Sequence, residues 1–142
     1  MKCPAVSPFL AVLALAGLVS CSSPETKAKE AAAVAAAEAW LKLTDAGDAA
    51  ASWEASAEFF RKAVPREQWA QSLSVARAPL GPLVRRTVKG SKYATRLPGA
   101  PDGEYVMVFF HASFSNKQSA VETVTPMLDK DGVWRVSGYY IR

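Results

Sequence analysis

The stretch of residues 102–142, DGEYVMVFFHASFSNKQSAVETVTPMLDKDGVWRVSGYYIR, decides the fold of this chain. Three of its segments are rich in Val, Phe, Tyr, Trp and Thr and show the period-two alternation of β-strands: residues 104–115, 119–128 and 133–141. Turn-forming pairs separate them, Asn116-Lys117 after the first and Asp131-Gly132 after the second. The stretch therefore predicts three consecutive antiparallel strands.

A further strand is expected just upstream, at residues 83–97. It carries five basic side chains, Arg85, Arg86, Lys89, Lys92 and Arg96. A strand with this many charges suits the edge of a sheet. Gly90 within it predicts a bulge, and Pro126 predicts another in a later strand because proline donates no ladder hydrogen bond.

The segment before the strands predicts three helices. Residues 25–46 are rich in alanine and in charged helix formers, and Gly47 followed by Asp48 is typical of a helix end and of the next N-cap. Apolar residues recur on one face of the second helix: Trp53, Ala57, Phe60 and Val64. Pro65 fits the first position of the third helix, which ends at residues 79–82.

These elements predict an α+β domain in which three N-terminal helices pack on a four-stranded antiparallel meander sheet. Half of the 142 residues are apolar, which is enough for one core. A single domain is expected over residues 27–142. The net charge of +4 is spread over several elements, which argues against nucleic-acid binding.

The start of the chain is typical of a secretory signal. Lys2 precedes an apolar run over residues 9–19 that is too short to cross a bilayer as a helix. The run ends in Leu18-Val19-Ser20-Cys21, which resembles the lipobox of bacterial lipoproteins and implies that Cys21 is acylated. The expected division is then a lipoprotein signal peptide over 1–20, a lipidated tether over 21–26 and the single domain over 27–142. The alternative is an ordinary cleaved signal with Cys21 left as an incidental thiol.

Acylation of Cys21 predicts a location and a first partner. We expect a protein of the cell envelope that is held to a membrane through its lipid anchor. Ser22 resembles the outer-membrane sorting pattern, so the domain would face the periplasm. Because Cys3 leaves with the signal peptide, the mature chain forms no internal disulfide and has no cysteine metal site.

Four polar residues form the candidate site. If Asn116-Lys117 makes a two-residue hairpin, His111 lies opposite Glu122, and a matching alignment of the last hairpin also brings Tyr140 to face Glu122. A carboxylate, an imidazole and a phenol together could perform acid–base chemistry, or they could form a satisfied polar cluster. Arg77 would hold an anionic ligand or, more favourably, pair with Glu122. A three-residue turn or a bulge at Pro126 changes these pairings.

The aromatic residues allow two interpretations. They could line a ligand cavity between helices and sheet, or they could simply fill the core: Trp40, Trp53, Trp69, Trp134, Phe59, Phe60, Phe109, Phe110, Tyr105 and Tyr140. The filled core is the favoured interpretation. The sequence contains no phosphate-binding loop, metal-ligand spacing or nucleophile elbow, so it predicts no catalytic residue, no metal site and no cofactor.

The two faces of the central strand suggest a further partner. One face carries Val106, Val108, Phe110, Ala112 and Phe114, and the other carries Tyr105, Met107, Phe109 and His111. The three helices can cover only one of these largely apolar faces. We expect the other to be covered by a second copy of the domain, or by curling of the sheet itself.

Distinctive short pieces then point to a family. They are Trp40-Leu41-Lys42-Leu43, Asp45-Ala46-Gly47, Ser52-Trp53-Glu54, Phe59-Phe60-Arg61, Gln68-Trp69, Arg77-Ala78-Pro79-Leu80-Gly81, Leu97-Pro98-Gly99 and residues 101–105 and 131–141. In this order they resemble the bacterial envelope family called domain of unknown function 4019, over about residues 31–142. The resemblance implies a small cystatin-like or nuclear-transport-factor-like α+β domain. The family has no established activity, so the resemblance implies no catalytic residues.

The sequence as a whole favours an envelope lipoprotein whose domain binds or scaffolds something in the periplasm without catalysis. One alternative is a protein with a small-molecule pocket, whose ligand the sequence does not identify. A further alternative is an enzyme that resembles the isomerases and dehydratases of this shape, with His111, Glu122 or one of the tyrosines as its acid or base.

Overall fold

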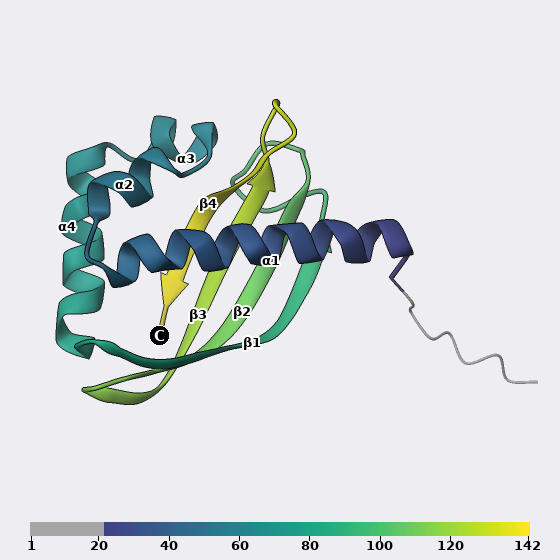
Figure 1. Cartoon of the computed structure of the whole chain (residues 1–142). Coiled ribbons are helices and arrows are strands. Elements are labelled where there is room, and N and C mark those ends of the chain that lie inside the picture. Colours follow the sequence, from purple (N-terminus) through teal and green to yellow (C-terminus); the bar gives the residue numbers. More distant parts are fainter. Residues whose placement is uncertain (1–21) are drawn as a thin grey trace, which may run out of the picture.

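One antiparallel sheet and the helices on one of its faces make up the computed structural model, which describes residues 22–142 (Figure 1). In chain order the elements are α1 (Pro24–Asp45), α2 (Ala49–Glu54), α3 (Glu58–Ala63), α4 (Arg66–Arg77), the 3₁₀ turn η1 (Ala78–Leu80), β1 (Leu83–Ala94), β2 (Tyr105–Phe114), β3 (Lys117–Leu128) and β4 (Trp134–Ile141). The strands lie in the order β1-β2-β3-β4, each antiparallel to the next. The predicted α+β class and four-stranded meander are therefore confirmed.

The described residues contain four α-helices where the sequence predicted three. The predicted second helix is interrupted after Glu54, because the backbone of Ala57 turns to extended geometry and its N–H donates to the carbonyl of Val136 on β4 at 2.8 Å. A backbone group committed to the sheet cannot continue a helical ladder. Pro65 is the N-cap of α4 rather than its first residue.

Helix α1 is long and buries only its second part. Ser23 caps it by accepting a hydrogen bond from the N–H of Thr26 at 3.1 Å, so the helix begins inside the predicted tether. Its buried residues start at Ala33 and include Trp40 and Thr44. Gly47 then takes the positive φ of +73° that the sharp end requires, as predicted. Among the described residues, no helix has the length and apolarity of a membrane-spanning segment.

Aromatic rings fill the space between the helices and the sheet. The ring of Trp69 lies 5.6 Å from that of Trp40 and 5.3 Å from that of Phe60, and Tyr139 on β4 lies 5.4 Å from Trp40. The indole N–H groups of Trp40 and Trp69 both donate to buried Ser52, to its carbonyl at 2.8 Å and its hydroxyl at 2.9 Å. The packing of Trp40, Phe60 and Trp69 fits the favoured interpretation of a filled core, whereas Tyr140 from the same predicted set is 62% exposed.

The hairpin between β2 and β3 differs from the prediction by one residue. Its turn is Ser115 and Asn116, so Phe114 pairs with Lys117, and a one-residue shift follows on β2. Phe110 consequently pairs with Glu122, and His111 pairs with Val121. The predicted pairing of His111 with Glu122 is wrong, since a shift of one residue moves a side chain to the other face of the sheet.

The hairpin between β3 and β4 also shifts by one residue, at Pro126. The register changes between Thr125 and Pro126, so Tyr140 pairs with Thr123 rather than facing Glu122. The bulges that Pro126 and Gly90 predicted are both present. The predicted position of Tyr140 opposite Glu122 is therefore wrong. The cause is the bulge at Pro126, which the sequence itself predicted.

The two faces of β2 have different surroundings. The face that carries Val106 through Phe114 in alternation is the one that the helices cover, and these residues are all buried. On the outer face, the loop before β2 covers Tyr105, whose hydroxyl donates to the carbonyl of Pro101 at 2.5 Å, and Leu97 packs nearby. Met107, Phe109 and His111 beyond it remain half-buried.

Candidate functional site

Glu122 on β3 is the centre of the most unusual group of side chains in the domain. It is fully buried, with a relative exposure of 0%. Arg86 on β1 donates to both of its carboxylate oxygens, from Nε at 2.6 Å and from Nη2 at 3.1 Å. The hydroxyl of Tyr139 on β4 donates to Oε1 at 2.7 Å, and Nη1 of Arg77 lies 3.4 Å from the same oxygen. A buried carboxylate therefore has a full set of donors.

A second carboxylate, that of Asp45 at the end of α1, binds the same two arginines. Its oxygens lie 2.6 Å from Nη2 of Arg77 and 2.6 Å from Nη1 of Arg86. Each carboxylate thus lies between two guanidinium groups, and two negative charges balance two positive ones. We call Asp45, Arg77, Arg86, Glu122 and Tyr139 the buried charge cluster, after the fully buried Glu122 at its centre. The side chains of Arg77 and Arg86 are 11% exposed, and that of Asp45, at the rim, is 21% exposed. The cluster joins α1 and α4 to three of the four strands.

The local sequence explains how each member reaches this position. Asp45 is the last residue of α1, where Gly47 turns the chain away, and Arg77 is the last residue of α4. Cations are favoured at a helix C-terminus, so Arg77 suits its place. Its guanidinium also lies 4.8 Å from the ring of Phe114. Arg86 and Glu122 lie on the inner face of the sheet, where partner-free charges would be costly.

The cluster shifts the pKa values of Asp45, Arg86 and Tyr139. Burial alone would raise the pKa of Asp45, but hydrogen bonds from Arg86 and Arg77 outweigh burial and hold this pKa below its ordinary value. Burial lowers the pKa of Arg86, but the hydrogen bonds to Asp45 and Glu122 raise it by a larger amount, so the net shift is upward. Burial and the adjacent Glu122 raise the pKa of Tyr139. All three groups keep their usual ionisation state at neutral pH.

The structure brings together two of the four residues that the sequence singled out. Arg77 and Glu122 form the expected ion pair. His111 lies on the outer face, where its Nε2 is 3.1 Å from the hydroxyl of Ser119, and Tyr140 is 62% exposed on that same face. The imagined trio of carboxylate, imidazole and phenol does not form.

Sequence reasoning missed Asp45, Arg86 and Tyr139. The signal for Tyr139 was present, because a bulge at Pro126 exchanges Tyr139 for Tyr140 on the inner face. Arg86 stood beside Arg85 in a basic strand, and only the register with Phe110 and its neighbours shows which of the two points inward. Asp45 lies at the end of the predicted first helix, and nothing in the local sequence indicates an ion pair there.

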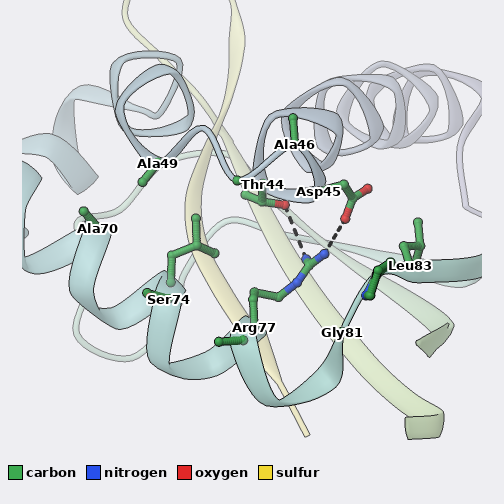
Figure 2. Close-up of a pocket in the computed structure, with 13 residues that line it drawn as sticks. Thr44, Asp45, Ala46, Ala49, Ala70, Ser74, Arg77, Gly81 and Leu83 are labelled. Atoms are coloured by element: carbon green, nitrogen blue, oxygen red, sulfur yellow. Dashed lines mark hydrogen bonds and ion pairs between the residues drawn. The ribbon is translucent and has the colours of Figure 1, made fainter. Parts of the chain in front are cut away.

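A groove of about 440 Å³ opens beside the cluster, between the end of α1, α4 and the start of β1 (Figure 2). Thr44, Asp45, Leu73, Ser74, Arg77 and Leu83 are among the residues that line it. Figure 2 shows the guanidinium of Arg77 turned toward Thr44 and Asp45 rather than into open space. The only guanidinium in the lining is therefore already bound to a carboxylate.

The chemistry available at this site is limited by its pairing. A general acid or base has to exchange a proton with a substrate, whereas each carboxylate here accepts hydrogen bonds from two arginines. Within residues 22–142, every buried side-chain polar atom has a hydrogen-bond partner. The same residues contain no group of His, Cys, Asp and Glu side chains suited to a metal ion. The arrangement can fix the helices on the sheet, and among the described residues it leaves no buried side-chain polar atom without a hydrogen-bond partner.

Comparison with known proteins identifies a family. The family model described as "Protein of unknown function (DUF4019)" matches residues 36–139, which is more than half of the chain and includes the whole buried charge cluster. No curated protein and no solved structure matches the chain. The cystatin-like or nuclear-transport-factor-like shape therefore stays a prediction. The chain belongs to the DUF4019 family of proteins of unknown function.

Proposed function

We propose that this protein is a lipid-anchored domain of the cell envelope that binds or scaffolds other envelope components and catalyses no reaction. The observation that carries the non-catalytic part is the closed pairing of the buried charge cluster, in which both carboxylates are neutralised by the same two arginines. The packed rings of Trp40, Trp69 and Tyr139 support it further, because they occupy the space in which a ligand cavity would lie.

The lipid anchor rests on the sequence. Cys21 follows Leu18-Val19-Ser20 at the end of the apolar run, and it lies outside the described residues. In the proposed mature protein Cys21 is the first residue and carries the acyl chains, and Ser22 directs the protein to the outer membrane with its domain in the periplasm. Several acyl chains on one residue give stable anchoring where one chain would not.

Mass spectrometry of the intact protein from a membrane fraction tests this proposal. We expect a mature chain that begins at Cys21 and is heavier by its acyl groups. Cys21→Ala should give an unacylated product, while Cys3→Ala is a matched control that should leave acylation unchanged because Cys3 belongs to the removed segment. Cleavage at another position, with an unmodified Cys21, would overturn the anchor.

A small-molecule pocket is the second candidate, and the groove of about 440 Å³ beside Arg77 favours it. A ligand there would have to compete with Asp45 for the guanidinium, so an anion is the fitting class. Ser74→Trp, at an exposed position in the lining, should block the groove without disturbing the core. Native mass spectrometry of wild type and this variant would separate the candidates, since only a groove-bound ligand is lost from the variant.

The proposed homodimer concerns the outer face of the sheet. Met107, Phe109 and Val121 are half-buried there, and Tyr140 is exposed. Tyrosine and methionine are enriched at protein interfaces, so a second copy packed sheet to sheet is the proposed occupant. Sedimentation of the acyl-free protein tests it, and a clean monomer at high micromolar concentration would exclude a stable dimer.

A further inference from the structure

The start of α1 is attached to the edge of the sheet. Glu30 accepts a hydrogen bond from the backbone N–H of Tyr93, near the end of β1, at 3.1 Å. The preceding residue, Lys29, pairs with Glu104, which also accepts a hydrogen bond from the hydroxyl of Tyr93 at 2.7 Å. The first turns of α1 are therefore held against strand β1 by direct contacts.

The proposed anchor lies very close to the start of α1. Only Ser22 and Ser23 separate Cys21 from Pro24, and Ser23 already caps α1. Three residue steps of extended chain span at most about 10 Å. If Cys21 carries the acyl chains, as the proposed function holds, the start of α1 cannot move farther than this from the lipid headgroups. The side of the domain at which α1 begins then faces the bilayer.

That side is basic. Strand β1 contains four basic residues and no acidic one, and it is the outermost strand on the side from which α1 projects (Figure 1). Lys27, Lys89 and Lys92 are exposed there, and no described residue forms an ion pair with them. We call these three lysines the basic edge.

The acidic groups of this region offset only part of the charge of the basic edge. Glu25 and Glu104 both pair with Lys29, Asp102 pairs with Arg96, and Glu30 is bound to a backbone N–H. The positive charge of Lys27, Lys89 and Lys92 is thus available to a partner. A bilayer that contains anionic phospholipids attracts basic residues held within a Debye length of its surface.

We infer that the basic edge is the surface on which the domain rests against the anionic membrane that anchors it. This inference depends on the proposed lipid anchor and adds an orientation to it. β1 lies along the bilayer, while α4 and the groove beside Arg77 point toward the periplasm. The competing explanation is that edge lysines only prevent strands of two molecules from pairing, in which case they need not approach lipid.

A single-label experiment distinguishes the two explanations. In the acylated protein the sulfur of Cys21 is blocked, so a cysteine introduced at an exposed position is the only free thiol. Thr87→Cys places a fluorophore midway along β1, where the short tether alone does not bring it to lipid, and Gln71→Cys places one on α4. Both positions are exposed. The acylated chains are reconstituted on phosphatidylcholine vesicles that contain phosphatidylglycerol and a headgroup quencher.

We expect the label at position 87 to be quenched several-fold more than the label at position 71. This difference should fall in vesicles without phosphatidylglycerol, in about 1 M salt, where the Debye length is about 3 Å, and in the Lys27→Gln, Lys89→Gln, Lys92→Gln variant. The matched control, Arg61→Gln, Lys117→Gln, Lys130→Gln, removes equal charge from other elements and should keep the difference.

Each other outcome has a distinct meaning. Equal quenching of the two labels in protein whose acylation is verified by mass spectrometry would overturn the orientation and leave the proposed anchor in place. Unequal quenching that persists in the lysine variant would overturn the role of the basic edge. A preparation that carries no acyl group on Cys21 would overturn the proposed anchor, and the orientation with it.

Discussion

Arg86 and Lys89 lie three residues apart on β1 and have opposite surroundings. The side chain of Arg86 is 11% exposed and is bound to two carboxylates, whereas Lys89 is exposed without an ion-pair partner among the described residues. Buried charges with complete pairing build a fold, because breaking the pair is costly, while unpaired surface charges are free to meet a partner. The comparison divides the domain into a helix-covered face that holds it together and an edge that is available for contact.

The largest effect should come from breaking the covered face at Glu122. Glu122→Ala leaves the guanidinium groups of Arg77 and Arg86 short of a counter-charge in a buried position. We expect a loss of about 4–5 kcal/mol in the free energy of unfolding, measured by urea titration. An unchanged unfolding midpoint would show that the carboxylate is not structural, and a binding or catalytic role for it would gain ground.

The aromatic core on the same face should respond almost as strongly. Trp69→Ala removes a ring that is 6% exposed and contacts Trp40 and Phe60, so we expect a loss of about 3–4 kcal/mol. Trp134 is only half-buried, and Trp134→Ala should cost clearly less. Thermal unfolding of both variants checks this order. Equal and small shifts would mean that the space between helices and sheet is not tightly filled.

Asp45 should make the stability of the domain depend on pH. Its pKa is lower in the folded chain than in the unfolded chain, so its stabilising contribution is present above the unfolded value of about 3.9 and is lost as the pH falls through the folded value. We expect unfolding curves to show falling stability below about pH 4. Asp45→Asn should be less stable at neutral pH and should show a weaker loss on acidification. An identical pH profile in the variant would contradict this assignment.

The basic edge should contribute least to stability. Lys89→Gln and Lys92→Gln remove exposed, unpaired charges, so each should change the free energy of unfolding by no more than about 0.5 kcal/mol. Urea unfolding of both variants beside Arg86→Gln provides the comparison within one strand. A large loss of unfolding free energy in the lysine variants would show that these side chains stabilise the fold. They would then not be free surface charges, and the proposed orientation would lose its basis.

The sequence predicted the parts of the fold that depend on local chemistry. Alternating residues marked the strands, Gly47 and Asp48 marked the end of one helix and the start of the next, and Gly90 and Pro126 marked bulges. Each of these signals acts within a few residues of its own position. The split between α2 and α3 was missed because its cause is a hydrogen bond from Ala57 to a strand about eighty residues later.

The candidate site was harder to predict because it depends on register. One residue of shift in each of two hairpins places Tyr139 rather than Tyr140 beside Glu122 and moves His111 to the opposite face. The pairing of Arg77 with Glu122 needed no register, since a buried charge demands an opposite one. The second arginine and the second carboxylate come from elements far apart in sequence, and no local pattern connects them.

The central claim is that the buried charge cluster is a structural unit and not a reactive site. A double-mutant cycle between Arg86 and Glu122, with Arg86→Met and Glu122→Gln measured by urea unfolding, tests it most directly. Because the two side chains share two hydrogen bonds, the double variant should lose less stability than the sum of the single variants, with a coupling energy of about 1–3 kcal/mol. Additive losses, or single variants as stable as the wild type, would contradict the claim.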